Sequence, residues 1–216
     1  MTKLGVLASG RGSNFQAIIN AINAGTLKAS LELLIVDNPS AYAVERAKKH
    51  GIPHLYMNPK DFGTQDGFFA GIADGLKSRG VELVVLAGFM RIVRKPLLDA
   101  FPMRVMNIHP ALLPSFPGLH GQRQAVDYGV RISGCTVHFV DEGMDTGPVI
   151  IQAAVPVMPD DTEESLSERI LGLEHKIFPE AIRLFSEGRL EVSGRKVRII
   201  NASKAVHGVI VNPPLS

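Results

Sequence analysis

The sequence predicts an α/β protein with a mostly parallel, Rossmann-like sheet, helices on both faces and an antiparallel pair of strands toward its C-terminal end. The main observation is that short apolar runs alternate with helix-like segments through the first half of the chain, which is typical of βαβ units. We expect strands at residues 4–8, 31–36, 54–57, 83–87 and 105–108, and helices at 14–23, 41–50, 67–77 and 96–100. Because ligands of such sheets collect outside the carboxyl ends of the strands, functional residues should follow the strands directly.

The second half of the chain has a different pattern. Residues 131–140 and 148–157 are strand-like, and the short polar segment DEGMDTG joins them, as in an antiparallel pair with a loop. A long helix should follow the polar run 160–164, because apolar residues recur three and four positions apart at Leu166, Ile170, Leu173, Ile177, Ala181 and Leu184. Glu174 falls on this stripe and needs a partner there, which is either a ligand or solvent at the edge of the stripe. Residues 190–192 and 197–200 are candidates for short strands.

Length and composition indicate one ordinary globular domain. The 216 residues suffice for one α/β domain with a real core, and 45% hydrophobic and 20% charged residues lie near the globular average. We draw no internal boundary, so residues 1–190 form the domain and 191–216 extend it. A formal charge of +2 without a block of like charges gives no sign of a nucleic acid or a membrane as partner, so we expect neither, and a monomer or a homodimer stays open.

Cysteine and histidine usage bears on location and on metal binding. The single cysteine, Cys135, cannot form an internal disulfide, and residues 1–10 enter a strand without a long apolar signal region, so we expect a cytoplasmic protein. Cys135 lies in the alternating run 132–140 and is expected to be a half-buried strand residue, not a nucleophile. No metal is predicted, because five histidines lack metal-ligand spacing with one another and with Cys135: His54, His120, His138, His175 and His207.

A glycine-containing loop follows the first strand and runs into a helix, with the sequence SGRGSN at residues 9–14. Glycines let backbone amides approach an anion, and a helix N-terminus adds unpaired N–H groups, so a phosphate fits there. Two alternatives stay open. The loop is a tight turn with Ser13 or Asn14 as helix cap, or it is a dinucleotide site in which Asp37 binds a ribose. Phe15 stands where the dinucleotide motif has its third glycine and disfavours the second alternative.

The fifth expected strand ends in two polar residues, Asn107 and His109, which strand alternation places on one face. Histidine exchanges protons near neutral pH and asparagine offers a donor for a developing oxyanion, so the pair is a candidate catalytic site. The alternative is a histidine satisfied within the core beside a capping asparagine, but the place at the carboxyl end of a central strand favours function. One of Asp141, Glu142 and Asp145 would raise the pKa of His109, and spacing does not choose among them.

Several segments together carry a resemblance to a known family. They are GRGSN at 10–14, LAGFMRI at 86–92, NIHPALLP at 107–114, PGLH at 117–120, VHFV at 137–140 and DTGP at 145–148. In combination they resemble the glycinamide ribonucleotide formyltransferase family, over about residues 3 to 190. The resemblance implies that a formyl group moves from the co-substrate 10-formyltetrahydrofolate to the amine of glycinamide ribonucleotide, in purine biosynthesis.

The resemblance also implies a role for each matching position. The catalytic residues would be Asn107, His109 and Asp145. The phosphate of the ribonucleotide would be held by Gly12, Ser13 and Asn14, and its ribose or glycinamide portion by Glu174. The folate would be surrounded by Met90, Arg91, Ile92, Val93, Asn107 and Asp141. Gln65 stands where many members carry an arginine that approaches the folate's glutamate tail, which puts that contact in doubt. The alternatives are a 10-formyltetrahydrofolate hydrolase and a nucleotide-binding module without catalysis.

Overall fold

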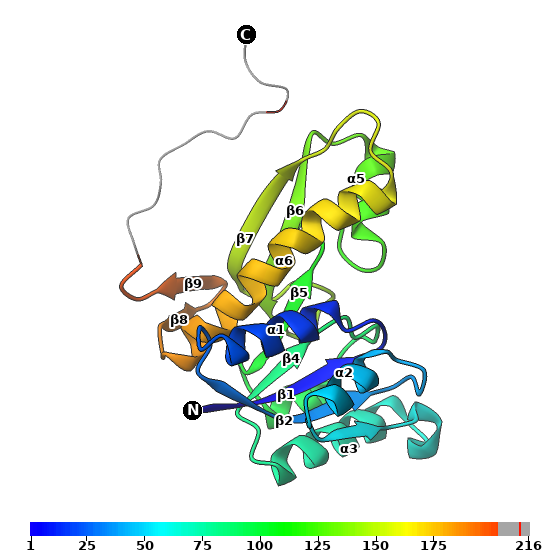
Figure 1. Cartoon of the computed structure of the whole chain (residues 1–216), viewed down its shortest axis with the longest axis vertical. Coiled ribbons are helices and arrows are strands. Elements are labelled where there is room, and N and C mark those ends of the chain that lie inside the picture. The colour runs from blue at the N-terminus through cyan, green and yellow to red at the C-terminus, as the bar shows by residue number, and fades with distance from the viewer. Residues whose placement is uncertain (203–211, 213–216) are drawn as a thin grey trace.

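The computed structural model describes residues 1–202 and 212, and in this part of the chain one nine-stranded sheet lies between two layers of helices (Figure 1). The strands are β1 (Thr2–Ala8), β2 (Ala29–Val36), β3 (His54–Tyr56), β4 (Leu83–Leu86), β5 (Val105–His109), β6 (Ile132–Phe139), β7 (Val149–Pro156), β8 (Leu190–Ser193) and β9 (Lys196–Ile199). The helices are α1 (Ser13–Asn23), α2 (Ala43–Lys49), α3 (Gln65–Ser78), α4 (Lys95–Ala100), α5 (Gly121–Tyr128) and α6 (Glu163–Ser186), and Pro59–Phe62 form a 3-10 turn.

The strand order in the sheet is β3-β2-β1-β4-β5-β6-β7-β9-β8. The predicted parallel half is confirmed, because β3, β2, β1, β4 and β5 all pair in parallel. The predicted antiparallel pairing of β6 with β7 is also confirmed. The sequence did not predict that β5 itself pairs antiparallel with β6, so that Asn107 lies directly opposite His138.

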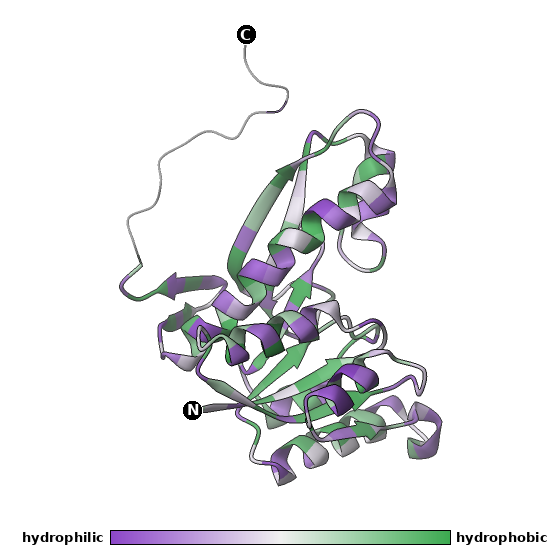
Figure 2. Ribbon diagram, in the orientation of Figure 1, coloured by the Kyte–Doolittle hydropathy of each residue, from purple (hydrophilic) through white to green (hydrophobic). Residues whose placement is uncertain are grey.

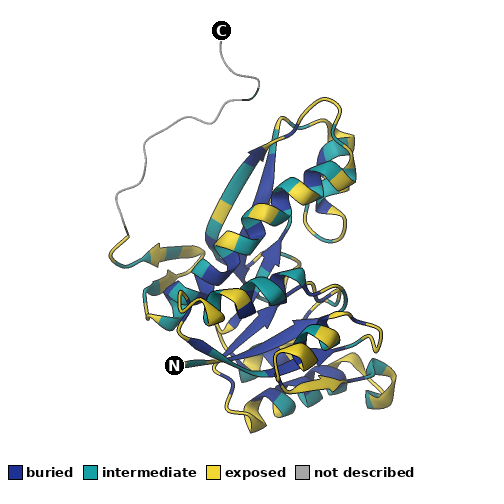
Figure 3. Cartoon of the chain, viewed as in Figure 1, coloured by how far each residue is buried: buried dark blue, intermediate teal, exposed yellow. Residues whose placement is uncertain are grey.

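The apolar residues of the strands divide the helices between the two faces of the sheet. In β1, Leu4 and Val6 join one core cluster, to which α1 and α6 contribute Phe15 and Phe178. Leu7 points to the other face and joins the cluster that contains the buried residues of α3 and α4. The central strands β1, β2 and β4 are mainly hydrophobic (Figure 2), and they are mostly buried, whereas the helices around them carry many exposed residues (Figure 3). Helices therefore cover both faces, as predicted.

The long helix α6 crosses the sheet and carries one of the candidate site residues. It begins with a capping box, in which the side chains of Thr162 and Ser165 each accept a hydrogen bond from the other residue's backbone N–H. Four of the six predicted stripe residues are buried, and Leu173 and Ile177 are partly buried against the core. The stripe therefore packs as expected and holds Glu174 at a fixed place.

Helix α5 was not predicted. Its sequence GQRQAVDY buries only Gly121 and Ala125 and has no apolar stripe.

The predicted short strands near residues 190 and 200 are present as β8 and β9, and β9 extends the sheet by pairing with β7. His207 lies outside the described residues.

Candidate active site

The candidate site lies where the strand order reverses. β1 sits between β2 and β4, and the loop after β1 leads to α1 on one face, whereas the loop after β4 leads to α4 on the other. Ligands of open α/β sheets bind outside the strand ends at this place. The two loops are tied together, because Ser9 N–H donates to the carbonyl of Gly88 and Ser9 Oγ accepts from Met90 N–H, each at 3.0 Å.

The loop after β1 leaves the start of α1 open. Gly12 is the N-cap in the left-handed conformation (φ 67°, ψ 32°), and a Cβ placed there would come within 2.8 Å of the Ala43 Cβ. No side chain caps the helix. The interpretation of this loop as a turn capped by Ser13 or Asn14 is therefore wrong, and the first N–H groups of α1 remain available to an anion.

Asn14 is instead bonded to the carboxylate on α6. Its Nδ2 donates to Glu174 Oε2 at 2.7 Å, and both side chains are buried. Burial raises the pKa of Glu174, an effect that the hydrogen bond from Asn14 partly opposes. The alternative in which Glu174 reaches solvent is wrong. The Oδ1 atom of Asn14 is buried and has no hydrogen-bond partner, which is the state of a group that a polar ligand would satisfy.

His109 is held between two acceptors. Its Nε2 lies 2.8 Å from the carbonyl oxygen of Phe116, and its Nδ1 lies 3.4 Å from Asp145 Oδ2. The same carboxylate oxygen accepts a hydrogen bond of 2.7 Å from Gly118 N–H. Both Phe116 (φ 53°) and Asp145 (φ 55°) have left-handed backbones, a strained conformation that is common where a site needs a group held in one place.

Asp145 is thus the one of the three loop carboxylates that lies beside His109. Asp141 accepts hydrogen bonds from Gly143 N–H and from Thr146 Oγ1, so it shapes the loop. Glu142 is exposed, and its Oε1 lies 3.9 Å from Lys95 Nζ.

Burial lowers the pKa of His109 from its ordinary value of 6.5, and this effect exceeds the opposite effects of Asp145 and of the Phe116 carbonyl. The expected raising of the pKa is therefore right for the contribution of Asp145 and wrong for the net value in the free protein. Burial would raise the pKa of Asp145, but hydrogen bonds from His138 and Gly118 and the charges of the two histidines bring it below its ordinary value. The free site therefore pairs a carboxylate with an imidazole that gives up its proton easily.

His138 is a site residue that the sequence did not indicate. It is buried on β6, its Nε2 lies 3.2 Å from Asn107 Nδ2, and the same nitrogen lies 3.6 Å from Asp145 Oδ1. Its Nδ1 lies 2.9 Å from the carbonyl oxygen of Phe139. Asn107 and His109 are therefore brought together through His138 and Asp145. The segment VHFV at 137–140 contains His138 but indicates no role for it, and only the register of β6 against β5 places it beside Asn107.

The segment after β4 presents side chains of different kinds beside the site. Met90 and Ile92 are 63% and 51% exposed, whereas Val93 is buried. The guanidinium of Arg91 binds the buried carboxylate of Asp37, with 2.5 Å between Nε and Oδ2. The ion pair uses one oxygen of Asp37, and the other, Oδ1, is buried without a hydrogen-bond partner among the described residues.

Gln65 begins α3 and lines a second hollow of about 640 Å³ together with Lys60 and Arg91. Neither His109 nor the phosphate-loop residues Gly12, Ser13 and Asn14 line this hollow.

Three further observations limit the chemistry of the described residues. Cys135 is fully buried rather than half-buried, and burial, with the charge of Glu174, raises the pKa of its thiol to about 12. Within residues 1–202 and 212, no group of three or more His, Cys, Asp and Glu side chains is placed to hold a metal ion. No helix in this part of the chain is long and apolar enough to cross a membrane.

Comparison with curated proteins finds relatives over most of the chain. This chain is 44% identical over 183 residues to the phosphoribosylglycinamide formyltransferase of Bacillus subtilis. The aligned region covers 85% of this chain and 94% of that protein. The chain is 46% identical over 193 residues to the trifunctional purine biosynthetic protein adenosine-3 of Drosophila melanogaster, and spans only 14% of the length of that protein.

Solved structures and a family model agree with these relatives. Glycinamide ribonucleotide transformylase 1 from Symbiobacterium toebii superposes with a TM-score of 0.92 and 52% identity, covering 93% of this chain and 95% of that one. A formyltetrahydrofolate deformylase from Pseudomonas syringae superposes with a TM-score of 0.85 at 25% identity, covering 93% of this chain and 66% of that one. Residues 2–182 match the family model described as formyl transferase, and the chain therefore belongs to the formyl transferase family.

Proposed function

We propose that the chain transfers the formyl group of 10-formyltetrahydrofolate to the amine of glycinamide ribonucleotide, a step of de novo purine biosynthesis. The observation that carries the proposal is the position of His109 between two acceptors, beside Asn107 and at the strand ends that also open the phosphate loop. The names of the relatives that match most of this chain support it.

The ribonucleotide would bind at the start of α1. Gly12, Ser13 and Asn14 would hold its phosphate, because the N–H groups there have no side-chain cap. Glu174 would contact the ribose or the glycinamide portion. A buried carboxyl with a raised pKa and one bond to Asn14 is suited to hydrogen bonding with a hydroxyl or an amide.

The formyl donor would lie along the segment after β4. The exposed apolar side chains of Met90 and Ile92 offer a surface for a flat heterocycle, and Arg91, Val93, Asn107, Asp141 and Gln65 complete the proposed set. The reduced folate supplies the formyl carbon on a nitrogen that becomes the leaving group. Residues 1–190 would form this formyltransferase domain, and β9 supports the view that 191–216 extend it.

Asn107 and His109 would stabilise the negative charge that develops on the formyl oxygen. We infer that this oxygen takes the place of the Phe116 carbonyl at His109 Nε2, while Nδ1–H points to Asp145. The amine nitrogen forms a bond to the formyl carbon, the bond from that carbon to the folate nitrogen breaks, and the amine proton passes through water to the folate nitrogen. The charged imidazole and the oxyanion attract each other most strongly when the negative charge develops. The site therefore binds the transition state more tightly than the substrates.

A coupled absorbance assay tests this function. The protein is supplied with glycinamide ribonucleotide and 10-formyltetrahydrofolate, and a control omits the acceptor. We expect turnover only with the acceptor present. Turnover without the acceptor would identify a hydrolase, and no turnover together with tight binding of a dinucleotide would identify a nucleotide-binding module.

A further inference from the structure

A row of polar side chains crosses the three strands next to the candidate site. His109 on β5 lies opposite Thr136 on β6, and Thr136 lies opposite Gln152 on β7. Directly opposed residues of an antiparallel pair point to the same face of the sheet. His109 therefore has Thr136 as its cross-strand neighbour, and Gln152 lies one strand further away on the same face.

The segment that follows β5 folds back over this row. Thr136 is fully buried, and its hydroxyl donates to the carbonyl of Ala111 at 2.7 Å and accepts from Leu113 N–H at 3.0 Å. The side-chain Nε2 of Gln152 donates to the carbonyl of Leu113 at 2.9 Å and to the same hydroxyl at 3.0 Å. Thr136 and Gln152, which we call the loop clamp, thus fasten residues 111–113 to β6 and β7.

The donors of the loop clamp are all engaged with the protein itself. A threonine hydroxyl donates one hydrogen bond and accepts up to two, and all three are made in Thr136. The side-chain amide of Gln152 has two N–H groups, and both are used. The two side chains therefore hold the backbone of residues 111–113 and have no N–H or O–H left to offer a substrate.

The clamped segment leads directly to the groups that hold the candidate catalytic residues. Only two residues separate Leu113 from Phe116, whose carbonyl oxygen lies 2.8 Å from Nε2 of His109. Two residues further on, Gly118 N–H donates to Asp145 Oδ2 at 2.7 Å. So short a chain passes on a displacement of its anchored end, because each residue spans at most about 3.6 Å. Both contacts therefore depend on where the clamped segment lies.

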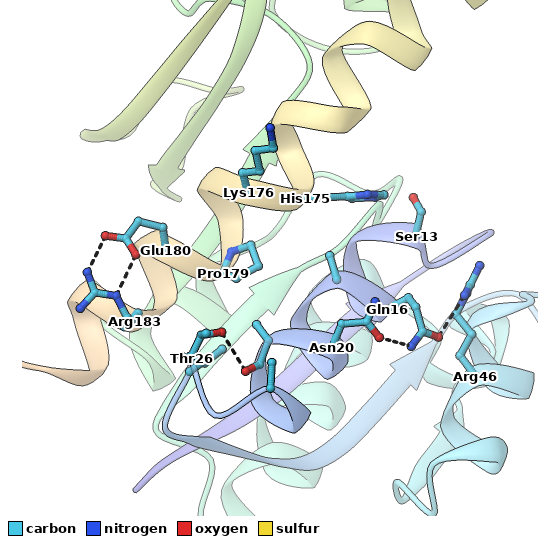
Figure 4. Close-up of a pocket in the computed structure, with 14 residues that line it drawn as sticks. Ser13, Gln16, Asn20, Thr26, Arg46, His175, Lys176, Pro179, Glu180 and Arg183 are labelled. Carbon is cyan, nitrogen blue, oxygen red and sulfur yellow. Dashed lines mark hydrogen bonds and ion pairs between the residues drawn. The ribbon is translucent and has the colours of Figure 1, made fainter.

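The loop clamp shares no residue with the groove between α1 and α6, which is lined at one end by Ser13 of the phosphate loop (Figure 4). It also shares none with the hollow beside Gln65. A change in the clamp should therefore alter the placement of the reacting groups more than the binding of either substrate.

We propose that the loop clamp positions the catalytic groups for formyl transfer. Thr136 and Gln152 act through the clamped segment, which sets where the loop places the acceptor for His109 and the donor for Asp145. The inference rests on the proposed function, in which the Phe116 carbonyl yields its place to the formyl oxygen. The clamp keeps the rest of the loop in position while it does so. A misplacement of about 1 Å can lower a rate about a hundredfold, so such a clamp can decide kcat.

The test uses three substitutions in the loop clamp. Thr136→Val keeps the shape of the side chain and removes the hydroxyl, Gln152→Met keeps the length and removes both N–H donors, and Thr136→Ser keeps the hydroxyl. We expect kcat to fall about tenfold or more in Thr136→Val and Gln152→Met, with both KM values within about twofold of the parent. Thr136→Ser should stay near the parent, and an equal fall in Thr136→Ser would overturn the proposal.

Ser133→Ala is the matched control for the loss of a buried hydroxyl. Ser133 lies on the same strand, and its Oγ has no hydrogen-bond partner in the described part of the chain. Urea unfolding of every variant separates a loss of folding from a loss of positioning. Gln152 is exposed, so Gln152→Met carries the test if Thr136→Val does not fold. Values of kcat in the folded clamp variants that match Ser133→Ala would overturn the proposal, even where those variants are less stable.

A second measurement needs no substrate. The NMR signals of the His109 ring respond to the Phe116 carbonyl and to Asp145, which the loop clamp positions. We expect these signals to shift in Thr136→Val and Gln152→Met and to keep the parent positions in Ser133→Ala. Unchanged His109 signals in both clamp variants would overturn the proposal.

The two proposals fail in different ways. If the parent transfers formyl groups to the ribonucleotide but the clamp variants change neither kcat nor the His109 signals, the clamp is wrong and the function stands. If the parent transfers none and the His109 signals do shift, the loop clamp holds the imidazole and the proposed function is wrong.

Discussion

The Oδ2 atom of Asp145 lies 3.4 Å from Nδ1 of His109 and accepts a hydrogen bond from Gly118 N–H at 2.7 Å. One carboxylate therefore joins two loops, the one after β5 and the one between β6 and β7, at the residue proposed for catalysis. The carbonyl oxygen of Phe116, next to Nε2 of His109, is the second acceptor for the same imidazole. This geometry stabilises a charged imidazole, while burial opposes it, and the predictions below depend on that balance.

Replacement of Gly12 should disrupt the phosphate loop. Gly12→Ala puts a Cβ at a left-handed position and within 2.8 Å of the Ala43 side chain, so we expect a loss of about 1–3 kcal/mol in the free energy of unfolding and a raised KM for the ribonucleotide. Gly10→Ala is the matched control, because no heavy atom lies within 4 Å of the added Cβ. Urea unfolding and steady-state kinetics measure both effects, and equal behaviour of the two variants would exclude a special role for Gly12.

Glu174 should make the stability of the protein fall as the pH rises. A carboxyl group whose pKa is higher in the folded than in the unfolded state stabilises the fold while it is protonated, and this contribution is lost as the pH rises through the folded pKa. Glu174→Gln keeps the size and removes the charge. At neutral pH the variant should be at least as stable as the parent, by up to about 1 kcal/mol, while its KM for the ribonucleotide rises.

Urea unfolding at a series of pH values above 4.5, the ordinary pKa of the group, measures the difference. The parent should lose stability relative to the variant as the pH rises. A difference that does not change with pH would show that Glu174 does not titrate as its burial requires.

Gln65 offers a way to strengthen binding of the folate tail. The hollow beside it is lined by Lys60 and by Arg91, whose Nε is occupied by Asp37. Gln65→Arg should improve the affinity for donors with several glutamates by about 1 kcal/mol, as expected of an exposed charge pair, and Gln65→Glu should weaken it. Dissociation constants for donors of different tail length give the result. A strong preference for long tails in the parent would instead point to Lys60, which Lys60→Gln would then test.

The parallel half of the sheet is predictable because its strands are short apolar runs bounded by turns. Leu4 to Ala8 and Leu83 to Leu86 are buried on both faces, so their sequences are nearly all apolar. Helix α5 is different, since only Gly121 and Ala125 are buried and Val126 is partly buried against the core, while most of its other residues are polar. Local periodicity does not distinguish such a segment from a loop.

The candidate site is only partly predictable for a similar reason. Asn107 and His109 could be paired because they are two residues apart on one strand. His138 could not be added, because it reaches Asn107 only through the antiparallel register of β6 on β5, and register between distant segments is a tertiary property. The net pKa of His109 was also out of reach, because it depends on how deeply the ring is buried.

The central claim is that Asp145 acts through the charge state of His109. Asp145→Asn keeps the size of the side chain and removes its charge, so the pKa of His109 should fall further below its ordinary value. Less of the enzyme then carries the imidazolium at neutral pH. We expect kcat to fall about a hundredfold or more, with both KM values little changed, and activity to recover partly at lower pH until the substrate amine is protonated. Glu142→Gln, on the same loop and exposed, is the control and should behave as the parent.

The most direct measurement is the pH–rate profile of Asp145→Asn with His109 titrated in parallel by NMR. The structure predicts that the pKa of His109 and the alkaline limb of the profile, where His109 loses its proton, move together to lower pH, relative to the parent and to Glu142→Gln. A variant in which both the pKa of His109 and kcat match those of the parent would contradict the claim and would return Asp141 and Glu142 to consideration.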